Sequence, residues 1–287
     1  MPVVNANGIN IYYEIHPAKN PKAQSDKTPL LLIMGMGLNS LSWHKNLPDL
    51  TAERTVIVFD NRGTGRSSKP DHPYSTRQMA ADAAGLLDVL RIRRAHVFGF
   101  SLGSLVAQEM ALHFTHKVKG LILGASSAGS FQHVMSSPAV YQTMVQRGWV
   151  NPEVAAEVIT PIIYSHQFIA SQPEKIRADK HDRLVYPTPP YAYRRQLMAA
   201  FNHNAYFRLD HLPMPTLLMT GSKDLLVIPE NSARLARRIP RAELKVLPGA
   251  GHYFTSEQPQ QMAHAVSDFL SRHFSSVAHS EQRRVAA

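Results

Sequence analysis

The chain has 287 residues, of which 44% are hydrophobic, and this length suits one large domain or a core with an inserted smaller part. It contains no cysteine, which excludes a disulfide framework, a thiolate nucleophile and a cysteine-based zinc site. The formal net charge of +10 comes from Lys and Arg residues that are spread along the chain without interleaved aromatic residues, so we expect no nucleic-acid partner.

The N-terminal stretch MPVVNANGIN has no basic region followed by an apolar segment, so we expect no secretory signal. The densest apolar run, PLLLIMGMGL, has about half the length needed to span a bilayer. We therefore expect a cytoplasmic protein without membrane insertion.

The predicted elements begin with a hairpin, because VVNANGINIYYEI places Asn7-Gly8 between alternating apolar residues. Short continuous apolar runs follow, and such runs are typical of strands buried on both faces of a parallel sheet. They cover residues 29–33, 55–59, 95–100, 120–124, 216–219 and 244–247.

Segments with helical periodicity alternate with these runs. We expect helices over residues 40–50, 76–90 and 102–113, and a last helix that Pro259 opens. Ser75 and Gln78 fit a capping box at the second of them. Alternating strands and helices predict an α/β fold with a mainly parallel sheet flanked by helices.

One stretch interrupts the alternation. Residues 126–215 contain no clear buried strand, but they hold helix-like pieces, the proline-rich YPTPPY and many aromatic residues. We predict a helical cap over 126–212, inserted into a core formed by 1–125 and 213–275. The polar tail, residues 276–287, is expected to be disordered.

The segment VFGFSLGSL carries the first candidate catalytic residue. Ser101 lies between Gly99 and Gly103, after a predicted strand and before a predicted helix. A tight turn at this point lifts a serine hydroxyl out of the sheet, where the helix N-terminus stabilises negative charge. Taken alone, the same pattern also fits a serine that merely begins a helix.

A serine needs a base and a group that orients the base. Asp224 and His252 each follow a predicted strand downstream, in the chain order Ser, Asp, His. Because active-site groups of open α/β sheets gather at the carboxyl ends of the strands, we expect the three side chains to meet. The predicted oxyanion donors are the backbone N–H groups of Leu102 and of Met36, in the loop after the first buried strand.

The Met36 loop also supports a different class of protein. Gly35 and Gly37 follow a strand, and Asp60 ends the next strand, as in part of a dinucleotide-binding fingerprint. Ser40 stands where the third glycine of that fingerprint belongs, so this alternative is the weaker one.

Several segments together resemble the α/β-hydrolase superfamily over nearly the whole chain. They are PLLLIMGMGLNSLSW, VFDNRGTGRSSKP, GFSLGS, GSKDLLVIP and GAGHYFTSEQP. Met34 replaces the histidine that is usual before the oxyanion loop, but the predicted donor is a backbone group. The chain is most similar to the carboxylesterase and 3-oxoadipate enol-lactonase-like group, which implies Ser101 as nucleophile, His252 as base and Asp224 as orienting acid.

We therefore predict hydrolysis of a carboxylic ester or lactone through an acyl-enzyme, with a small-molecule substrate and neither a cofactor nor a metal. A carbon–carbon bond hydrolase, a cofactor-free haloperoxidase or perhydrolase, and a non-catalytic binding protein on the same scaffold remain as alternatives. Apolar residues of the cap and one neighbour of His252 are expected to line the substrate cavity. They are Phe131, Met135, Tyr141, Met144, Tyr164, Phe168, Tyr191, Phe201 and Tyr253.

Overall fold

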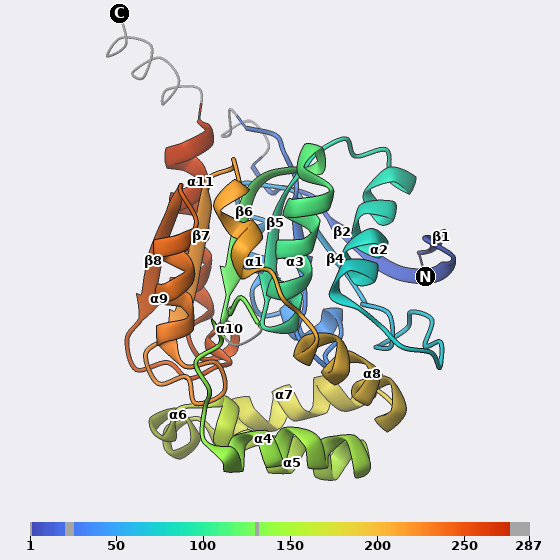
Figure 1. Cartoon of the computed structure of the whole chain (residues 1–287), viewed down its shortest axis with the longest axis vertical. Coiled ribbons are helices and arrows are strands. Elements are labelled where there is room, and N and C mark those ends of the chain that lie inside the picture. The colour runs from blue at the N-terminus through green and yellow to red at the C-terminus, as the bar shows by residue number, and fades with distance from the viewer. Residues whose placement is uncertain (1, 21–25, 130–131, 276–287) are drawn as a thin grey trace, which may run out of the picture.

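A twisted sheet of eight strands runs through the computed structural model, which describes residues 2–20, 26–129 and 132–275 (Figure 1). The strand order is β1-β2-β4-β3-β5-β6-β7-β8. The strands are β1 (Val3–Ala6), β2 (Ile9–His16), β3 (Leu30–Ile33), β4 (Val56–Phe59), β5 (Ala95–Phe100), β6 (Val118–Gly124), β7 (Thr216–Gly221) and β8 (Ala242–Leu247). The β1–β2 and β2–β4 pairs are antiparallel and the other pairs are parallel, so the predicted sheet type is confirmed.

The continuous apolar runs arise because each central strand faces a hydrophobic core on both sides. In β3, Leu31 and Ile33 belong to one core, whereas Leu30 and Leu32 belong to the other. Side chains of a strand point alternately to its two faces, so both sets must be apolar when both faces are covered. The predicted hairpin at Asn7-Gly8 is also confirmed: both residues have positive φ, at 50° and 78°, between β1 and β2.

Helices cover both faces of the sheet. On one side the core includes residues of α2 (Thr76–Val89), α3 (Leu102–His113) and α9 (Pro229–Arg238). On the other it includes residues of α1 (Leu47–Leu50) and α11 (Pro259–Phe274). Shorter elements are η1 (Ser40–Trp43), η2 (Thr115–Lys117), η5 (Tyr206–His211) and α10 (Phe254–Glu257).

The predicted helices over 76–90 and 102–113 and after Pro259 are confirmed, and the Ser75 hydroxyl accepts the Gln78 N–H at 3.1 Å. The single helix expected over 40–50 is wrong, because the chain forms two separate pieces there, η1 and α1. Pro48 accounts for the break, since a proline inside a continuous helix lacks the N–H and clashes with the carbonyl four residues earlier. It is tolerated in the first turn of α1.

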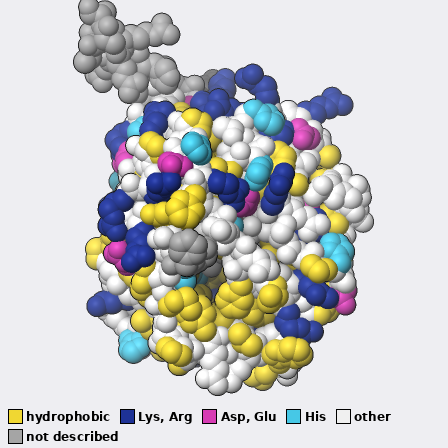
Figure 2. Space-filling view, in the orientation of Figure 1, with side chains coloured by type: hydrophobic (Ala, Val, Ile, Leu, Met, Phe, Trp, Pro, Cys, Tyr) yellow, Lys and Arg dark blue, Asp and Glu magenta, His cyan; other side chains and the backbone are white. Residues whose placement is uncertain are grey.

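A group of helices lies beyond the carboxyl ends of the strands, at the lower end of Figure 1. We call residues 138–201 the helical insertion. It consists of α4 (Pro138–Gln146), η4 (Arg147–Trp149), α5 (Pro152–Ile163), α6 (His166–Ser171), α7 (Pro173–Val185) and α8 (Pro190–Phe201). Figure 2 shows hydrophobic side chains gathered over this end of the molecule.

The helical insertion shares a hydrophobic core with the sheet. Ile159, Ile163 and Leu197 belong to the same buried cluster as residues of β3 and β7. The chain enters and leaves the insertion side by side, where Gly129 and Asn204 form an isolated antiparallel bridge. Within the described ranges, no helix has the length and apolar character needed to cross a membrane. The predicted tail, 276–287, lies outside the described residues.

Candidate active site

Ser101 stands at the turn between β5 and α3, in a backbone conformation that few residues adopt. Its φ is 53° and its ψ is −121°, a strained region for a residue with a side chain, which costs on the order of 1–3 kcal/mol. Its N–H donates to the Gly124 carbonyl at 2.8 Å, and its carbonyl accepts the Ser104 hydroxyl at 2.6 Å. The surrounding structure therefore holds Ser101 in this conformation.

The glycines on either side of Ser101 are required by close packing. A Cβ atom on Gly99 would lie 2.1 Å from the Gly103 carbonyl oxygen, and one on Gly103 would lie 2.0 Å from the Ile33 carbonyl oxygen. Gly103 thus lets the start of α3 pack directly against the end of β3. We call the turn between β5 and α3 the elbow. The two glycines determine its position above the sheet.

The three residues predicted to act together do lie within hydrogen-bonding distance. The Nε2 atom of His252 is 3.1 Å from the Oγ atom of Ser101, and its Nδ1 atom is 2.8 Å from Oδ2 of Asp224. His252 is 4% exposed and Asp224 2%. The Oδ1 atom of Asp224 accepts the N–H groups of Leu226 and Val227, both at 2.8 Å, which fixes the carboxylate relative to the imidazole.

The loops that carry Asp224 and His252 pack closely on each other. A Cβ atom on Gly221 would lie 2.2 Å from the Gly251 carbonyl oxygen, so only glycine permits this approach. Lys223 N–H donates to the Ala250 carbonyl at 2.8 Å. The pairing of β7 with β8 brings the two loops together at the same edge of the sheet.

Glu257 supports the histidine loop, a role that no motif in the sequence predicts. Its Oε1 atom accepts the Gly251 N–H at 3.0 Å and the Ser165 N–H at 2.8 Å, and its Oε2 atom accepts the Ser165 hydroxyl at 2.6 Å. One carboxylate therefore ties the loop before His252 to the helical insertion. The only local feature of the sequence that could have indicated this role is the position of Glu257, six residues after Gly251.

The loop that contains Met36 lies against Ser101. A Cβ atom on Gly35 would be 3.2 Å from the Ser101 Cβ. Several polar groups of the loop are engaged: Asn61 Nδ2 donates to the Met34 carbonyl at 2.9 Å, and Leu38 N–H to the Gly35 carbonyl at 3.3 Å. Among the hydrogen bonds of the described residues, none uses the Met36 N–H. The Leu102 N–H is at the first position of α3, where no partner exists within the helix.

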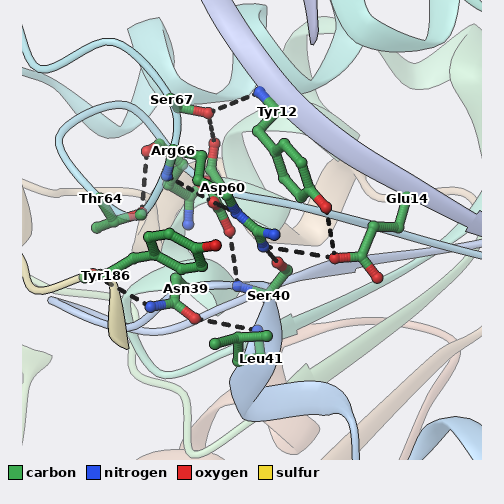
Figure 3. Close-up of polar contacts among 12 residues, drawn as sticks. Tyr12, Glu14, Asn39, Ser40, Leu41, Asp60, Thr64, Arg66, Ser67 and Tyr186 are labelled. Carbon is green, nitrogen blue, oxygen red and sulfur yellow. Dashed lines mark hydrogen bonds and ion pairs between the residues drawn. The ribbon is translucent and has the colours of Figure 1, made fainter. Parts of the chain in front are cut away.

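Behind this loop, Asp60 organises a buried polar network (Figure 3). Its Oδ1 atom accepts the Ser40 N–H at 2.7 Å and its Oδ2 atom the Arg66 N–H at 2.8 Å. The Arg66 guanidinium lies over the ring of Tyr12, 3.4 Å from its centroid, and faces Tyr186 of the insertion at 4.6 Å. Because Asp60 is fully buried and both of its oxygens are occupied, it cannot bind the ribose of a dinucleotide, which removes the main support for that alternative.

Gln196 of α8 connects the helical insertion to the Met36 loop. Its Oε1 atom accepts the Gly37 N–H at 2.9 Å, and its Nε2 atom donates to the Arg62 carbonyl at 2.8 Å. The side chain is fully buried. This bond fixes the orientation of the peptide that follows Met36, so Gln196 is a positioning residue for the loop.

Because the sequence predicts the Met36 N–H as an oxyanion donor, replacing Gln196 with Leu is expected to lower kcat for a chromogenic ester by about tenfold, with a smaller change in KM: a displaced donor would stabilise the transition state less. Steady-state kinetics would measure both constants. Gln167→Leu, at an exposed position of the same insertion, serves as the control. A rise in KM at unchanged kcat would instead assign Gln196 to substrate binding.

A small cavity of about 50 Å³ adjoins the Ser101 side chain. It is lined by Gly35, Met36, Leu38, Phe100, Ser101, Met144, Arg147, Ile159, Ile163, Arg183, Leu226, His252 and Tyr253. The predicted substrate contacts Met144 and Tyr253 and the predicted donor Met36 are therefore at this cavity. A larger surface hollow of about 660 Å³ lies between β8 and α11, and none of its lining residues is Ser101, Asp224 or His252.

The other predicted substrate contacts lie elsewhere. Met135 and Phe201 are 62% and 47% exposed. The Tyr141 hydroxyl is 2.6 Å from Nε2 of His133, and the Tyr191 hydroxyl donates to the Lys69 carbonyl at 2.8 Å. Tyr164 and Phe168 stack on each other in the core, 5.6 Å between centroids. Phe131 is outside the described residues.

In the described part of the chain, no three His, Asp or Glu side chains gather in a way that could hold a metal ion.

The chain is similar to known proteins in both sequence and structure. The family model described as alpha/beta hydrolase fold matches residues 28–259.

Among curated proteins, a poly(3-hydroxyalkanoate) depolymerase of Ectopseudomonas oleovorans is 32% identical over 85% of this chain and 85% of its own length. A 3-oxoadipate enol-lactonase of Acinetobacter baylyi is 28% identical over 87% of this chain and 91% of its own. Among solved structures, the chain is similar to a thermophilic esterase from Thermogutta terrifontis that was solved with malate bound. The TM-score is 0.82 and the sequence identity is 26%, and the match covers 96% of this chain and 100% of the esterase chain. With the family model covering most of its length, the chain belongs to the alpha/beta hydrolase family.

Proposed function

We propose that this hydrolase cleaves carboxylic esters or lactones of small molecules through an acyl-enzyme, with Ser101 as nucleophile, His252 as base and Asp224 as orienting acid. The observation that carries the proposal is the continuous line of short contacts from Ser101 Oγ through the His252 ring to Asp224. Relatives described as an esterase, an enol-lactonase and a polyester depolymerase support the same general reaction.

In the first half of the proposed reaction, the Ser101 hydroxyl donates its proton to Nε2 of His252 while its oxygen attacks the ester carbonyl. The N–H groups of Met36 and Leu102 donate to the oxyanion that forms. His252 then gives the proton to the departing alcohol oxygen. Asp224 accepts the Nδ1–H throughout, which stabilises the positive charge on the imidazole.

In the second half, a water molecule gives a proton to His252 and attacks the acyl carbonyl, which releases the acid and restores the Ser101 hydroxyl. We propose that residues 126–212 act as a cap over this site. Met144 and Tyr253, which both line the Ser101 cavity, are the proposed substrate contacts. In a site covered by such a cap, exclusion of water strengthens the hydrogen bonds to the oxyanion.

A covalent label tests the nucleophile directly. A fluorophosphonate probe, which reacts with activated serines, is expected to modify the protein once, on the peptide that contains Ser101, as measured by mass spectrometry. Activity against a chromogenic short-chain ester should fall in parallel with the labelling.

Ser101→Ala should prevent the labelling, whereas Ser271→Ala, at an exposed position of α11, is the control and should label like the wild type. A protein that hydrolyses the chromogenic ester while its label sits on another residue would contradict the assignment. A protein that neither labels nor turns over the ester would support a non-catalytic binding function.

A further inference from the structure

Two arginine side chains of the helical insertion line the cavity that contains Ser101. Arg147 belongs to η4, and Arg183 lies in the last turn of α7. Arg183 is 7% exposed, and its Nε atom is buried without a hydrogen-bond partner in the described structure. A guanidinium stays charged in proteins, and leaving a buried charge unpaired is strongly unfavourable.

The partners of both guanidinium groups are neutral. Arg147 donates to the Ala155 carbonyl at 3.1 Å and to the Tyr193 hydroxyl at 3.3 Å. Arg183 donates to the Tyr164 hydroxyl at 3.1 Å and lies 4.8 Å from the centre of the Tyr253 ring. These contacts satisfy some donors, but they do not neutralise either charge.

Asp179, which lies one helical turn before Arg183, has three other polar partners. Asp179 pairs with the Lys45 ammonium at 2.5 Å, and it also accepts the hydroxyls of Tyr164 and Ser256. Among the ion pairs of the described residues, none includes Arg147 or Arg183. The cavity wall beside Ser101 therefore carries an excess of positive charge.

Although burial favours a lower value, the side chains of Tyr164, Tyr253 and Asp179 raise the pKa of Arg183. The charge of Arg183 in turn acts on Arg147. Burial lowers the pKa of Arg147, although the Tyr193 hydroxyl partly opposes this, and the charge of Arg183 lowers it further. Like charges that share a buried site raise each other's electrostatic energy, and an anion placed between them removes this cost.

Two cavities meet at these residues. The cavity at Ser101 and a second one of about 40 Å³ among α5, α7 and α8 both include Leu38, Arg147 and Arg183 in their linings. The guanidinium groups thus stand between the nucleophile and the interior of the insertion. Apart from them, much of the wall at Ser101 is apolar, with Met144, Ile159 and Ile163 among its residues.

We propose that Arg147 and Arg183 form a carboxylate-binding subsite, so that the preferred substrate is an ester or lactone that bears a second, free carboxylate. This inference rests on the proposed function. A planar carboxylate matches the fork of N–H donors on a guanidinium, and the small cavity requires that the anionic group and the reacting carbonyl belong to one compact molecule.

Matched pairs of esters test the subsite. The monomethyl esters of succinate, glutarate and adipate are each compared with the neutral ester in which an isopropyl group replaces the carboxylate. For at least one length, the wild-type kcat/KM should favour the anionic ester by about tenfold or more, because a charge-assisted hydrogen bond replaces an unpaired donor. The preference should disappear in Arg183→Met and persist in part in Arg183→Lys.

The ratio of the two rates is independent of how much enzyme is folded, so partial misfolding does not obscure the result. Arg177→Met is the control, because Arg177 lies on the same helix and its side chain is 70% exposed; its ratio should equal that of the wild type. If the anionic and the neutral ester of every pair had equal kcat/KM, and Arg183→Met did not change this ratio, the subsite would be overturned. Ester hydrolysis itself would not be affected by that result.

Binding of glutarate separates the two proposals. If the wild-type protein hydrolyses none of the esters but glutarate raises its melting temperature, and Arg183→Met shows no such rise, the subsite stands while the proposed function fails. If glutarate shifts neither protein and the anionic esters have no advantage, the subsite is excluded.

Discussion

Replacing Ser101 with Ala is expected to lower kcat for a short-chain ester by on the order of 10⁴-fold or more, while the free energy of unfolding stays the same or rises. The loss follows from the proposed chemistry, since without Oγ no acyl-enzyme forms and His252 has no serine proton to accept. The stability should not fall because the Ser101 side chain makes no hydrogen bond that supports the elbow; its backbone makes them.

The measurement pairs kinetics with denaturant unfolding of the same preparations. Ser101→Ala, His252→Ala and the double variant should lose similar amounts of activity, because residues that act as a unit have non-additive effects. Ser271→Ala, at an exposed position of α11, is the control. A folded Ser101→Ala protein that keeps more than about a tenth of the wild-type kcat would contradict an acyl-enzyme mechanism with Ser101 as its nucleophile.

Much of the site could be predicted from local patterns. The apolar runs mark where the buried strands end, and the carboxyl ends of parallel strands share one edge of the sheet. For that reason Ser101, Asp224 and His252 could be expected to meet, although 151 residues separate the first from the last. The glycines flanking Ser101 carry the same information, since Gly103 permits the approach of α3 to β3 and Gly99 permits its approach to β5.

The parts that could not be predicted depend on how the helical insertion docks. Gln196 reaches Gly37 across 159 residues, and Glu257 reaches Ser165 across 92. Each is one polar residue in a helix, and periodicity says which side of a helix is buried but not which loop receives a given side chain. Arg183 illustrates the limit most clearly, because a charged residue in a polar helix is normally read as solvent-exposed.

The apolar residues of the insertion show the same limit. Phe201 and Met144 are both apolar residues in helices of the insertion, yet the first is 47% exposed and the second lines the Ser101 cavity. Short helices that pack on both a sheet and one another have more than one buried side, so an apolar residue does not identify the cavity wall.

Replacing Gly103 with Ala is expected to have the largest effect on stability. The new Cβ would lie 2.0 Å from the Ile33 carbonyl oxygen and 2.7 Å from its carbon, and both are backbone atoms of a central strand that cannot move aside alone. We expect the free energy of unfolding to fall by more than about 3 kcal/mol, a large share of the stability of a typical domain.

The same change should also remove activity from whatever protein remains folded. Ile33 ends β3 directly before the Met36 loop, and Gly103 is two residues after Ser101, so relief of the clash must move the turn at Ser101 away from the Met36 N–H. Urea unfolding and the specific activity of the folded fraction measure the two effects.

Gly85→Ala is the matched control, because that glycine lies inside α2 and its new Cβ would have no neighbour closer than 3.4 Å. There, the better helix propensity of alanine should leave stability unchanged or raise it by up to about 1 kcal/mol. If Gly103→Ala unfolded at the wild-type urea concentration, α3 and β3 would not be in the contact that places Ser101 beside the Met36 loop. That result would contradict both the expected loss of stability and the proposed position of the Met36 N–H beside Ser101.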